Sequence, residues 1–349
     1  MEKQKFSLKW GIVGIGRHAH RFMAPAIQKH PDSRLLAVYS RDMQRARQFA
    51  QEHNCPLAYD SLDALLENKE INVIYIGSPN HIHREQVLLA AQAGKHILCE
   101  KPLATTVEDA QIMVEACRKA GVKLGVSFHL RHNPIHLAVK EKIQADLLGD
   151  LLMVDVQYMH VTAGAESTFK IPTWRTDPVT AGGAGFIGTG VHAIDLLRYI
   201  SGQEILNLCA FADKSWYSCG SEKLIQASLY LGSGIVSSLS GGMMRYPSNN
   251  LIIYGSKATI RCNGSLGYFG GGRLEFLSDL GNQTTEFPNC DVYAREIEAF
   301  AESIQFDHEP NASGRDGLRA VEVVTGIYES LKTKSSVNLE EKLSGSHQP

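Results

Sequence analysis

The sequence predicts an α/β protein in which a doubly wound parallel sheet is followed by a second, mostly antiparallel sheet. Three observations lead to this prediction. Strand-like and helix-like segments alternate up to about residue 127, strand-like segments separated by short turns follow later, and 349 residues exceed the length of one ordinary core. We therefore expect two domains, residues 1–128 and residues 129–349.

The first half consists of short apolar runs, each followed by a helical pattern. Helix boundaries are marked by Ser61, by Thr106 with Asp109, and by the glycines Gly94 and Gly121. Because the runs are almost continuously apolar, they predict parallel strands that are covered by helices on both faces of the sheet. The expected strands are 9–16, 33–40, 72–78, 95–101 and 123–128.

The second half has a different pattern. A helix from Pro134 to about Leu148 precedes a long strand at 151–161, and a glycine-rich stretch leads to a helix at 190–200. Short turns between the strands that follow favour antiparallel pairing. These expected strands are 224–234, 235–241, 250–256, 258–264 and 273–279, and two helices at about 291–306 and 315–331 follow them.

The composition argues against several classes of protein. Lys and Arg (35) nearly balance Asp and Glu (37), so the net charge of −2 gives neither a basic field for nucleic acid nor a polybasic membrane patch. Seven scattered cysteines without a C-x-x-C pair indicate reduced thiols in a cytoplasmic protein, and neither a disulfide framework nor a zinc site. We expect no signal peptide and no membrane span.

A glycine-rich turn follows the first expected strand. The segment GIVGIGRHA (11–19) contains Gly14, Gly16 and Ala19 in a G-x-G-x-x-A spacing, with Arg17 and His18 between them. The first glycine permits a tight turn, the second lets a phosphate approach the backbone, and the small third residue lets helix and strand pack closely. Many turns carry three small residues, but this spacing at the start of a strand–helix–strand unit favours a bound dinucleotide.

The end of the second expected strand bears on which dinucleotide binds. Ser40 and Arg41 occupy the place where an acidic residue would bind the ribose of NAD, and Arg45 follows one helical turn later. A hydroxyl and two guanidinium groups suit a 2′-phosphate, so we expect NADP, with NAD as the alternative. Asp42 favours NAD, and a solvated helix start is the other interpretation of the two arginines.

Three segments together resemble one family. They are the glycine turn, the string SPNHIHREQVLLAAQAGKHILCEKPLA (78–104) and the segment GGAGFIGTGVHAIDLLRYI (182–200). On these residues, nearly the whole chain resembles the glucose–fructose oxidoreductase / inositol dehydrogenase (Gfo/Idh/MocA) family of nicotinamide-dependent oxidoreductases. The resemblance implies a Rossmann domain (1–128) that binds the dinucleotide. It also implies a substrate-binding α/β domain (129–349) with an open sheet, through which relatives form homo-oligomers.

The resemblance also gives a role to the charged end of the strand at 95–101. This apolar run ends in Glu100, Lys101 and Pro102, which by themselves could be a surface ion pair and a turn. In the family the lysine lies beside the nicotinamide and the reacting oxygen of the substrate, and a cis proline often follows it. Lys101 is thus expected to polarise a carbonyl and to stabilise the alkoxide-like charge of hydride transfer.

The preceding loop belongs to the same expected site. Asn80 and His83 either contact the nicotinamide ribose, as in relatives, or only cap a helix. The residues that the resemblance places near the cofactor, besides the glycine turn, are Ser78, Pro79, Asn80, His83, Glu100 and Lys101.

His192 is the second residue to which the resemblance gives a role in the reaction. In relatives this histidine begins a helix over the nicotinamide, and an imidazole suits transfer of the hydroxyl proton. Asp195 either orients the ring, contacts substrate, or is a structural carboxylate. Relatives usually carry an aspartate four residues before the histidine, where this chain has Gly188. Either the substrate does not need that group, or a carboxylate such as Glu166 or Asp177 replaces it, or catalysis has been lost.

Further residues are candidates for the substrate side. Trp174 and Arg175 suit a hydroxylated ring, although a core tryptophan and a surface arginine are equally good interpretations. Arg131 follows the last strand of the first domain, where relatives place polar residues around the site. The neighbouring His129 and His132 lack the spacing of metal ligands, so we expect no metal.

Three functions remain open at this point. The first is an NADP-dependent oxidoreductase that acts on a sugar, keto-sugar or cyclic polyol. The second is a dinucleotide-binding sensor that has lost catalysis, as the glycine at position 188 suggests. The third is an enzyme of the same fold that acts on a non-sugar carbonyl.

Overall fold

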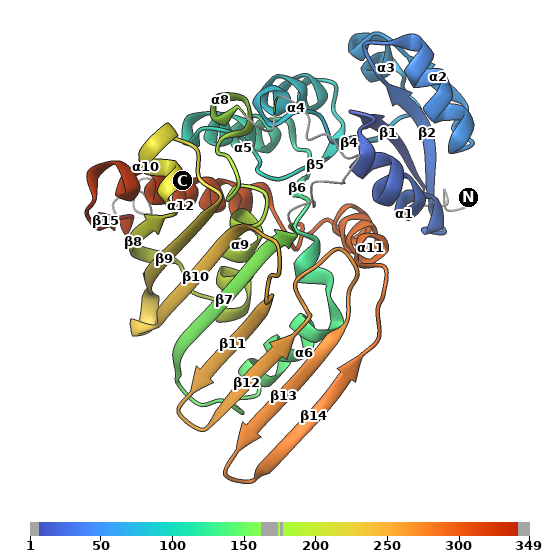
Figure 1. Cartoon of the computed structure of the whole chain (residues 1–349). Helices are drawn as coiled ribbons and strands as arrows, with labels where there is room; N and C mark the ends of the chain where they lie inside the picture. Colours follow the sequence, from blue (N-terminus) through green and yellow to red (C-terminus); the bar gives the residue numbers. More distant parts are fainter. Residues whose placement is uncertain (1–6, 162–173, 175–176, 341–349) are drawn as a thin grey trace. The chain divides into compact units, whose positions relative to one another are not determined.

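The computed structural model describes residues 7–161, 174 and 177–340, which form two compact units (Figure 1). The first unit consists of Met1–Phe128 with Tyr293–Leu318, and the second of His129–Val292 with Arg319–Pro349. The expected division assigns residues 293–318 to the second domain, whereas in the structure this segment folds with the first unit. Each unit is described by itself.

The first unit is built on a six-stranded sheet with the order β3-β2-β1-β4-β5-β6, in which all neighbouring strands are parallel. The doubly wound parallel sheet expected from the sequence is therefore confirmed. The strand order changes direction between β1 and β4, the place where such sheets bind ligands at the carboxyl ends of their strands. The strands are β1 (Leu8–Val13), β2 (Ser33–Tyr39), β3 (Leu57–Tyr59), β4 (Val73–Ile76), β5 (His96–Cys99) and β6 (Leu124–Val126).

The helices of this unit begin where their capping residues predict. The Ser61 hydroxyl accepts a hydrogen bond from the backbone N–H of Ala64, and the Thr106 hydroxyl accepts one from Asp109. The first helix starts with a π-helical turn, η1 (Ala19–Met23), that leads into α1 (Ala24–Lys29). The others are α2 (Met43–Glu52), α3 (Leu62–Glu67), the 3₁₀ turn η2 (Asn80–Ile82), α4 (His83–Gln92) and α5 (Val107–Ala120).

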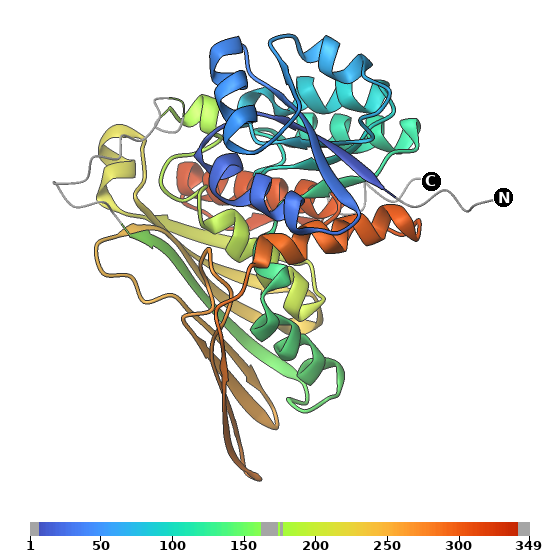
Figure 2. The same ribbon diagram turned by 90° about the vertical axis from the view of Figure 1, so that its right-hand side faces the viewer.

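Helix α11 (Val292–Gln305) contributes to the core of the first unit from far along the chain. It lies beside α1 (Figures 1 and 2), and the Tyr293 ring stacks on Phe22 with centroids 4.7 Å apart. The Phe300 ring lies 6.0 Å from that of Trp10, over Gly125, where a Cβ atom would come within 2.7 Å of it. The glycine therefore leaves room for the ring.

The second unit is built on a nine-stranded sheet with the order β14-β13-β12-β11-β7-β10-β9-β8-β15. Strands β7 and β10 pair in parallel and the other neighbours are antiparallel, so the expected, mostly antiparallel sheet is confirmed. The strands are β7 (Leu151–Val161), β8 (Ile205–Ala212), β9 (Leu224–Leu231), β10 (Val236–Met244), β11 (Asn250–Gly255), β12 (Ala258–Asn263), β13 (Gly272–Ser278), β14 (Gly281–Phe287) and β15 (Val337–Asn338).

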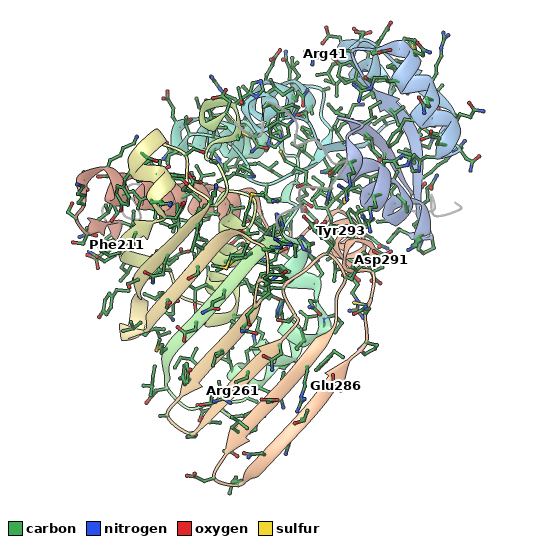
Figure 3. The ribbon with its side chains drawn as sticks, viewed as in Figure 1. Arg41, Phe211, Arg261, Glu286, Asp291 and Tyr293 are labelled. Atoms are coloured by element: carbon green, nitrogen blue, oxygen red, sulfur yellow. The ribbon has the colours of Figure 1, made fainter. Side chains whose placement is uncertain are left out.

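Helices cover one face of this sheet (Figure 1). Alternate residues of β7, such as Val154, Val156 and Tyr158, are buried on that face. The opposite face carries exposed side chains, among them Phe211 and Arg261 (Figure 3). The helical elements are η3 (His129–His132), α6 (Pro134–Gln144), α8 (Pro178–Ala181), α9 (Gly190–Ser201), α10 (Lys214–Cys219), η4 (Gly232–Gly234) and α12 (Gly314–Thr333).

None of the helices in the described ranges is both long enough and apolar enough to cross a membrane.

The packing of α11 leads to a prediction about stability. Replacing Phe300, which is 3% exposed, by Ala should lower the free energy of unfolding by about 3–5 kcal/mol, because it leaves a cavity under Trp10. Phe306→Ala is the matched control, since this ring is 66% exposed and its loss should change stability by less than about 0.5 kcal/mol. Urea unfolding measures both, and equal effects of the two variants would contradict the assignment of α11 to the core.

Candidate functional site

The glycine turn lies at the carboxyl end of β1 and fits a dinucleotide. Gly14 has φ +92°, and a Cβ atom there would lie 2.5 Å from the backbone nitrogen of Ser78, so only glycine fits between the ends of β1 and β4. At Gly16, by contrast, a Cβ atom would have no neighbour within 4 Å among the residues that the structure describes. Ala19 is buried, as close packing of the helix on the strand requires. A rigid turn with open space at its second glycine suits a pyrophosphate.

The end of β2 carries the residues that bear on the choice of dinucleotide. Asp42 caps α2, since its carboxylate accepts hydrogen bonds from the backbone nitrogens of Gln44 (2.9 Å) and Arg45 (3.2 Å). The Ser40 hydroxyl accepts a hydrogen bond from the Asp42 N–H at 3.3 Å. Arg41 and Arg45 are exposed, and Figure 3 labels Arg41. The acidic side chain here is therefore engaged by its own helix, while two cationic side chains extend into solvent.

Glu100 directly follows β5, and neighbouring side chains stabilise its negative charge. Its carboxylate accepts a hydrogen bond from the Tyr75 hydroxyl at 2.9 Å and lies 3.1 Å from Nε2 of His18. Burial by itself would raise the pKa of Glu100, but His18, Lys101 and Tyr75 together hold that pKa well below its ordinary value. Burial, and then the charge of Glu100, raise the pKa of Tyr75, so the phenol stays a donor.

The turn after Glu100 is held by a buried histidine. The peptide bond between Lys101 and Pro102 is cis, as the resemblance implies. In the His83 ring, Nδ1 lies 3.1 Å from the carbonyl oxygen of Pro102, and Nε2 lies 3.0 Å from that of Ser78. Burial lowers the pKa of His83. The resemblance places His83 near the cofactor, and a helix cap is the alternative. In the structure its ring lies between two backbone segments and holds the turn that carries Lys101.

The predicted residues of the first unit therefore gather at one edge of its sheet. Gly14 follows β1, Ser40 follows β2, Ser78 follows β4 and Glu100 follows β5. Asn80 is buried at the start of η2, two residues beyond Ser78. Because these strands are parallel, their carboxyl ends lie at the same edge.

In the second unit, His192 belongs to a closed ring of five aromatic side chains, which we call the five-ring cluster. Around this cluster the centroid distances are 4.6 Å from His129 to His192, 6.2 Å from His192 to Tyr158 and 5.7 Å from Tyr158 to His160. The ring closes with 5.6 Å from His160 to Tyr268 and 6.2 Å from Tyr268 to His129. His129 and His192 are buried, whereas Tyr268 is 41% exposed.

Three of these five side chains were not identified from the sequence. Tyr158 and His160 lie on the same face of β7, which the alternation of residues 151–161 would place together, but nothing in the sequence links them to His192. Tyr268 lies in the loop between β12 and β13, where no periodicity applies. Its hydroxyl lies 3.0 Å from Nε2 of His160.

Two buried residues of the second unit hold the loop that carries Tyr268. The Asn133 amide donates to the carbonyl oxygens of Ser265 (2.9 Å) and Gly271 (3.1 Å), at the two ends of the loop. In the His136 ring, Nδ1 donates to the carbonyl of Leu130 (2.7 Å), and Nε2 lies 3.1 Å from the Ser265 hydroxyl, from which it accepts. Nε2 of His129 lies 3.0 Å from the carbonyl oxygen of Gly267. The position of Tyr268 is thus set by side chains on η3 and α6.

Side-chain hydrogen bonds also fix the segment that leads into α9. The buried Glu222 carboxylate accepts hydrogen bonds from the backbone nitrogens of Ala184 (2.9 Å) and Phe186 (3.1 Å) and from the Tyr328 hydroxyl (2.8 Å). The Thr189 hydroxyl accepts a hydrogen bond from the Gly242 N–H at 2.8 Å. These bonds hold the glycine-rich segment that leads into His192.

Arg131 and Asp195 differ from their expected roles. Their side chains, 4% and 1% exposed, form a double hydrogen bond of 2.8 Å and 2.6 Å with each other. The Arg131 guanidinium also lies over the Tyr199 ring, 4.8 Å from its centroid. The fork of the arginine matches the carboxylate, so the two side chains form a buried pair that joins η3 to α9. The expectation is that both residues contact substrate, whereas the structure shows them engaged with each other.

Of the remaining candidates, Trp174 and Asp177 are described by the structure. Arg175 and Glu166 fall outside the described residues. The carbonyl oxygen of Trp174 accepts a hydrogen bond from the Thr180 hydroxyl at 2.7 Å. Asp177 is exposed and lies 3.0 Å from the same hydroxyl, directly before α8. Asp177 thus has the position of a helix-start carboxylate.

Comparison with known proteins identifies the family. Residues 8–128 match the oxidoreductase family model for the NAD-binding Rossmann fold, and residues 140–339 match the model for the C-terminal alpha/beta domain of the same family. The chain belongs to the Gfo/Idh/MocA oxidoreductase family. It is thus an oxidoreductase with an NAD(P)-binding Rossmann domain, as its motifs predict.

Individual relatives cover nearly the whole chain. The 1,5-anhydro-D-fructose reductase of Ensifer adhaerens is 24% identical over 334 residues, 95% of this chain and 98% of its own length. The NADP⁺-dependent D-xylose 1-dehydrogenase 2 of Haloferax volcanii is 26% identical over 339 residues, 95% of this chain and 100% of its own. The aldose-aldose oxidoreductase of Caulobacter crescentus, solved with glycerol, has the same fold, with a TM-score of 0.86 at 24% identity over 95% of this chain and 100% of its own. The segments HREQ, CEKPLA, HLR and TWR also resemble 1,5-anhydrofructose reductases.

The burial of His136 leads to a prediction about pH. Burial lowers the pKa of His136 to about 4 from an ordinary 6.5, so between these values only the unfolded chain binds the proton. Because of this residue, the free energy of unfolding of the wild type should fall by about 2 kcal/mol when the pH falls from about 7.5 to about 5. In His136→Gln that part of the loss should vanish, which urea unfolding at the two pH values measures. An unchanged pH dependence in the variant would contradict the prediction.

Proposed function

We propose that the protein is an NADP-dependent oxidoreductase that transfers a hydride between the nicotinamide and a sugar, keto-sugar or cyclic polyol. The observation that carries the proposal is the turn Glu100-Lys101-Pro102, at the same sheet edge as the glycine turn. The positive charge of Lys101 lies next to the buried carboxylate of Glu100 and attracts it. A cation at this edge suits an oxygen that becomes negative during the reaction.

Each of the chain's own residues has one task in this proposal. The nicotinamide, when bound, gives or takes the hydride. Lys101 donates a hydrogen bond to the reacting oxygen of the substrate and stabilises its developing charge. His192 gives or takes the hydroxyl proton. His83, Arg131 and Asp195 position these groups without contacting substrate.

The choice of NADP rests on the end of β2. The Asp42 carboxylate already accepts two backbone hydrogen bonds at the start of α2, which weakens it as a partner for a ribose hydroxyl. Arg41 and Arg45 offer forked donors that suit the three oxygens of a 2′-phosphate. A relative named as an NADP⁺-dependent dehydrogenase supports the same choice.

A sugar or polyol substrate is supported by the relatives named as a reductase of anhydrofructose and a dehydrogenase of xylose. The second candidate function is the sensor without catalysis, which the glycine at position 188 favours. Lys101 and His192 oppose it, because binding of a dinucleotide alone requires neither of them. A non-sugar carbonyl would change only the residues that contact the substrate.

Two properties of the assembly belong to the same proposal. We propose a homo-oligomer through the open face of the nine-stranded sheet, where Phe211, Tyr230 and Val236 are 65%, 49% and 49% exposed. We also propose a cytoplasmic location. The six cysteines whose side chains are described are free thiols, and four of them are buried, as suits a reducing compartment.

The role of Lys101 can be tested with a methionine of similar length. Lys101→Met should lower kcat by about 100-fold or more on any substrate that the wild type turns over, because the charge on the oxygen loses its donor. NADPH binding, followed by fluorescence, should change little. Lys119→Met, at a site that is 71% exposed, is the matched control and should keep wild-type turnover. Turnover that survives in Lys101→Met would refute the proposed mechanism.

The cofactor preference can be tested at Arg41. Arg41→Ala should raise the Kd for NADPH about tenfold or more, because a charge-assisted bond to the 2′-phosphate is lost, and should leave that for NADH nearly unchanged. Arg47→Ala removes an exposed arginine of α2 and is the control. Equal affinity of the wild type for NADH and NADPH, measured by titration calorimetry, would rule out the preference.

A further inference from the structure

We propose that His18 and Tyr75 are positioning residues for the hydride transfer. Together they hold the carboxylate of Glu100, which in turn holds the backbone of Lys101. The inference rests on the proposed function, in which Lys101 binds the reacting oxygen, and it adds two residues that act on the lysine without contacting substrate. All four residues belong to the first unit.

The carboxylate of Glu100 joins the lysine to two other segments of the sheet edge. One oxygen, Oε2, accepts a hydrogen bond from the backbone N–H of Lys101 at 3.3 Å. The other, Oε1, accepts one from the Tyr75 hydroxyl at 2.9 Å and lies 3.1 Å from Nε2 of His18. The position of Lys101 therefore depends on a residue of β4 and on a residue of the glycine turn.

The fold of the sheet directs Tyr75 toward Glu100. Tyr75 pairs with Leu98 across β4 and β5, and the pairing continues to Glu100, whose N–H donates to the carbonyl of Ile76 at 2.8 Å. Glu100 lies two residues beyond Leu98 and therefore on the same side of the sheet. A Cβ atom at Gly77 would lie 2.7 Å from Cε1 and 2.9 Å from the hydroxyl oxygen of Tyr75, so this glycine leaves room for the phenol.

Two aromatic rings hold the imidazole of His18. Its centroid lies 5.2 Å from that of Phe22 and 5.2 Å from that of Tyr293, which meets it at an angle of 75° and is labelled in Figure 3. Phe22 and Tyr293 stack on each other at 4.7 Å, so the three rings form one packed group. With the ring held on two sides, Nε2 faces Glu100.

The protons of the cluster fit only an ionised Glu100. Burial, and then the charge of Glu100, raise the pKa of Tyr75, so the hydroxyl keeps its proton. A carboxylate only accepts, so the other proton of the cluster lies on Nε2 of His18. A protonated carboxyl would present a third donor to these two and would lose the strength of a charged acceptor. Burial raises the pKa of Glu100, but its two partners and Lys101 together hold it well below its ordinary value.

The other titratable groups near the cluster come from β5, α4 and α11. Burial, and then the charge of the neighbouring carboxylate, raise the pKa of Cys99, which stays a thiol. Burial lowers the pKa of His83. On α11, Glu296 and Tyr293 add to the rise in the pKa of Tyr75. These shifts all favour neutral forms, so none of these groups supplies a positive charge to the cluster.

The first test measures the ionisation of Glu100 in the NADP-loaded protein by ¹³C NMR, with glutamate labelled at Cδ. Its signal is the one that disappears in Glu100→Gln. In the wild type this signal should not titrate between about pH 5 and pH 8, whereas in the double variant His18→Phe/Tyr75→Phe it should titrate in that range, because burial then dominates. The double variant keeps both rings and removes only the donors.

The second test measures the reaction, with NADP⁺ and D-glucose, D-xylose or myo-inositol as probes. Each single variant should lower kcat about tenfold or more at pH 7.5, because the lysine is displaced, and the loss should grow toward pH 5.5. The Kd for NADPH should stay within about threefold of the wild type. His18→Gln, whose amide keeps an N–H donor, should recover part of kcat.

Tyr217→Phe and His308→Phe, at exposed positions, are the matched controls and should behave as the wild type in both tests. A Glu100 signal that titrates in the wild type, or that stays constant in the double variant, would overturn the proposal. An unchanged kcat and pH profile in both single variants would overturn it as well. If the wild type turned over none of the three probes, the proposed function would be contradicted, and the NMR titration would still decide whether His18 and Tyr75 hold the charge.

Discussion

Glu100 keeps a negative charge in a place where burial alone would neutralise it, and the candidate site of the first unit depends on that charge. The carboxylate needs the hydroxyl of Tyr75 and the imidazole of His18, and these come from β4 and from the glycine turn. A charge held from several directions fixes the segments that hold it. The glycine turn, the end of β4 and the turn of Lys101 are thereby joined at one edge of the sheet.

In the second unit, buried polar side chains hold the segments on either side of the five-ring cluster. Glu222 and Thr189 fix the entry to α9, while Asn133 and His136 fix the loop of Tyr268. Each of these side chains is buried and bonds to at least one backbone group, so its bonds have few alternatives. The five-ring cluster lies between these two fixed segments, and the contact between the Tyr268 hydroxyl and His160 lies within it.

The sequence was sufficient to predict features that depend only on residues close together along the chain. Gly14 and the cap at Thr106 could be predicted because φ angles and capping bonds are set within a few residues. The pairing of Arg131 with Asp195 could not, since 64 residues separate the two and the helical spacing of Asp195 fits His192 equally well. Short strands such as β3 were missed because three residues show no period. That Tyr293–Gln305 of helix α11 cluster with the first unit could not be predicted, because an amphipathic pattern does not say which core a helix joins.

The glycine at position 188 looks like a lost function when only the sequence is considered, because a carboxylate is missing where relatives carry one. In the structure the same position borders a histidine ring, since a Cβ atom there would lie 3.6 Å from Cε1 and Nδ1 of His160. Stabilising charge on the reacting oxygen is a separate task that falls to Lys101 in the proposed mechanism. The loss of one carboxylate at position 188 is therefore weak evidence for the sensor.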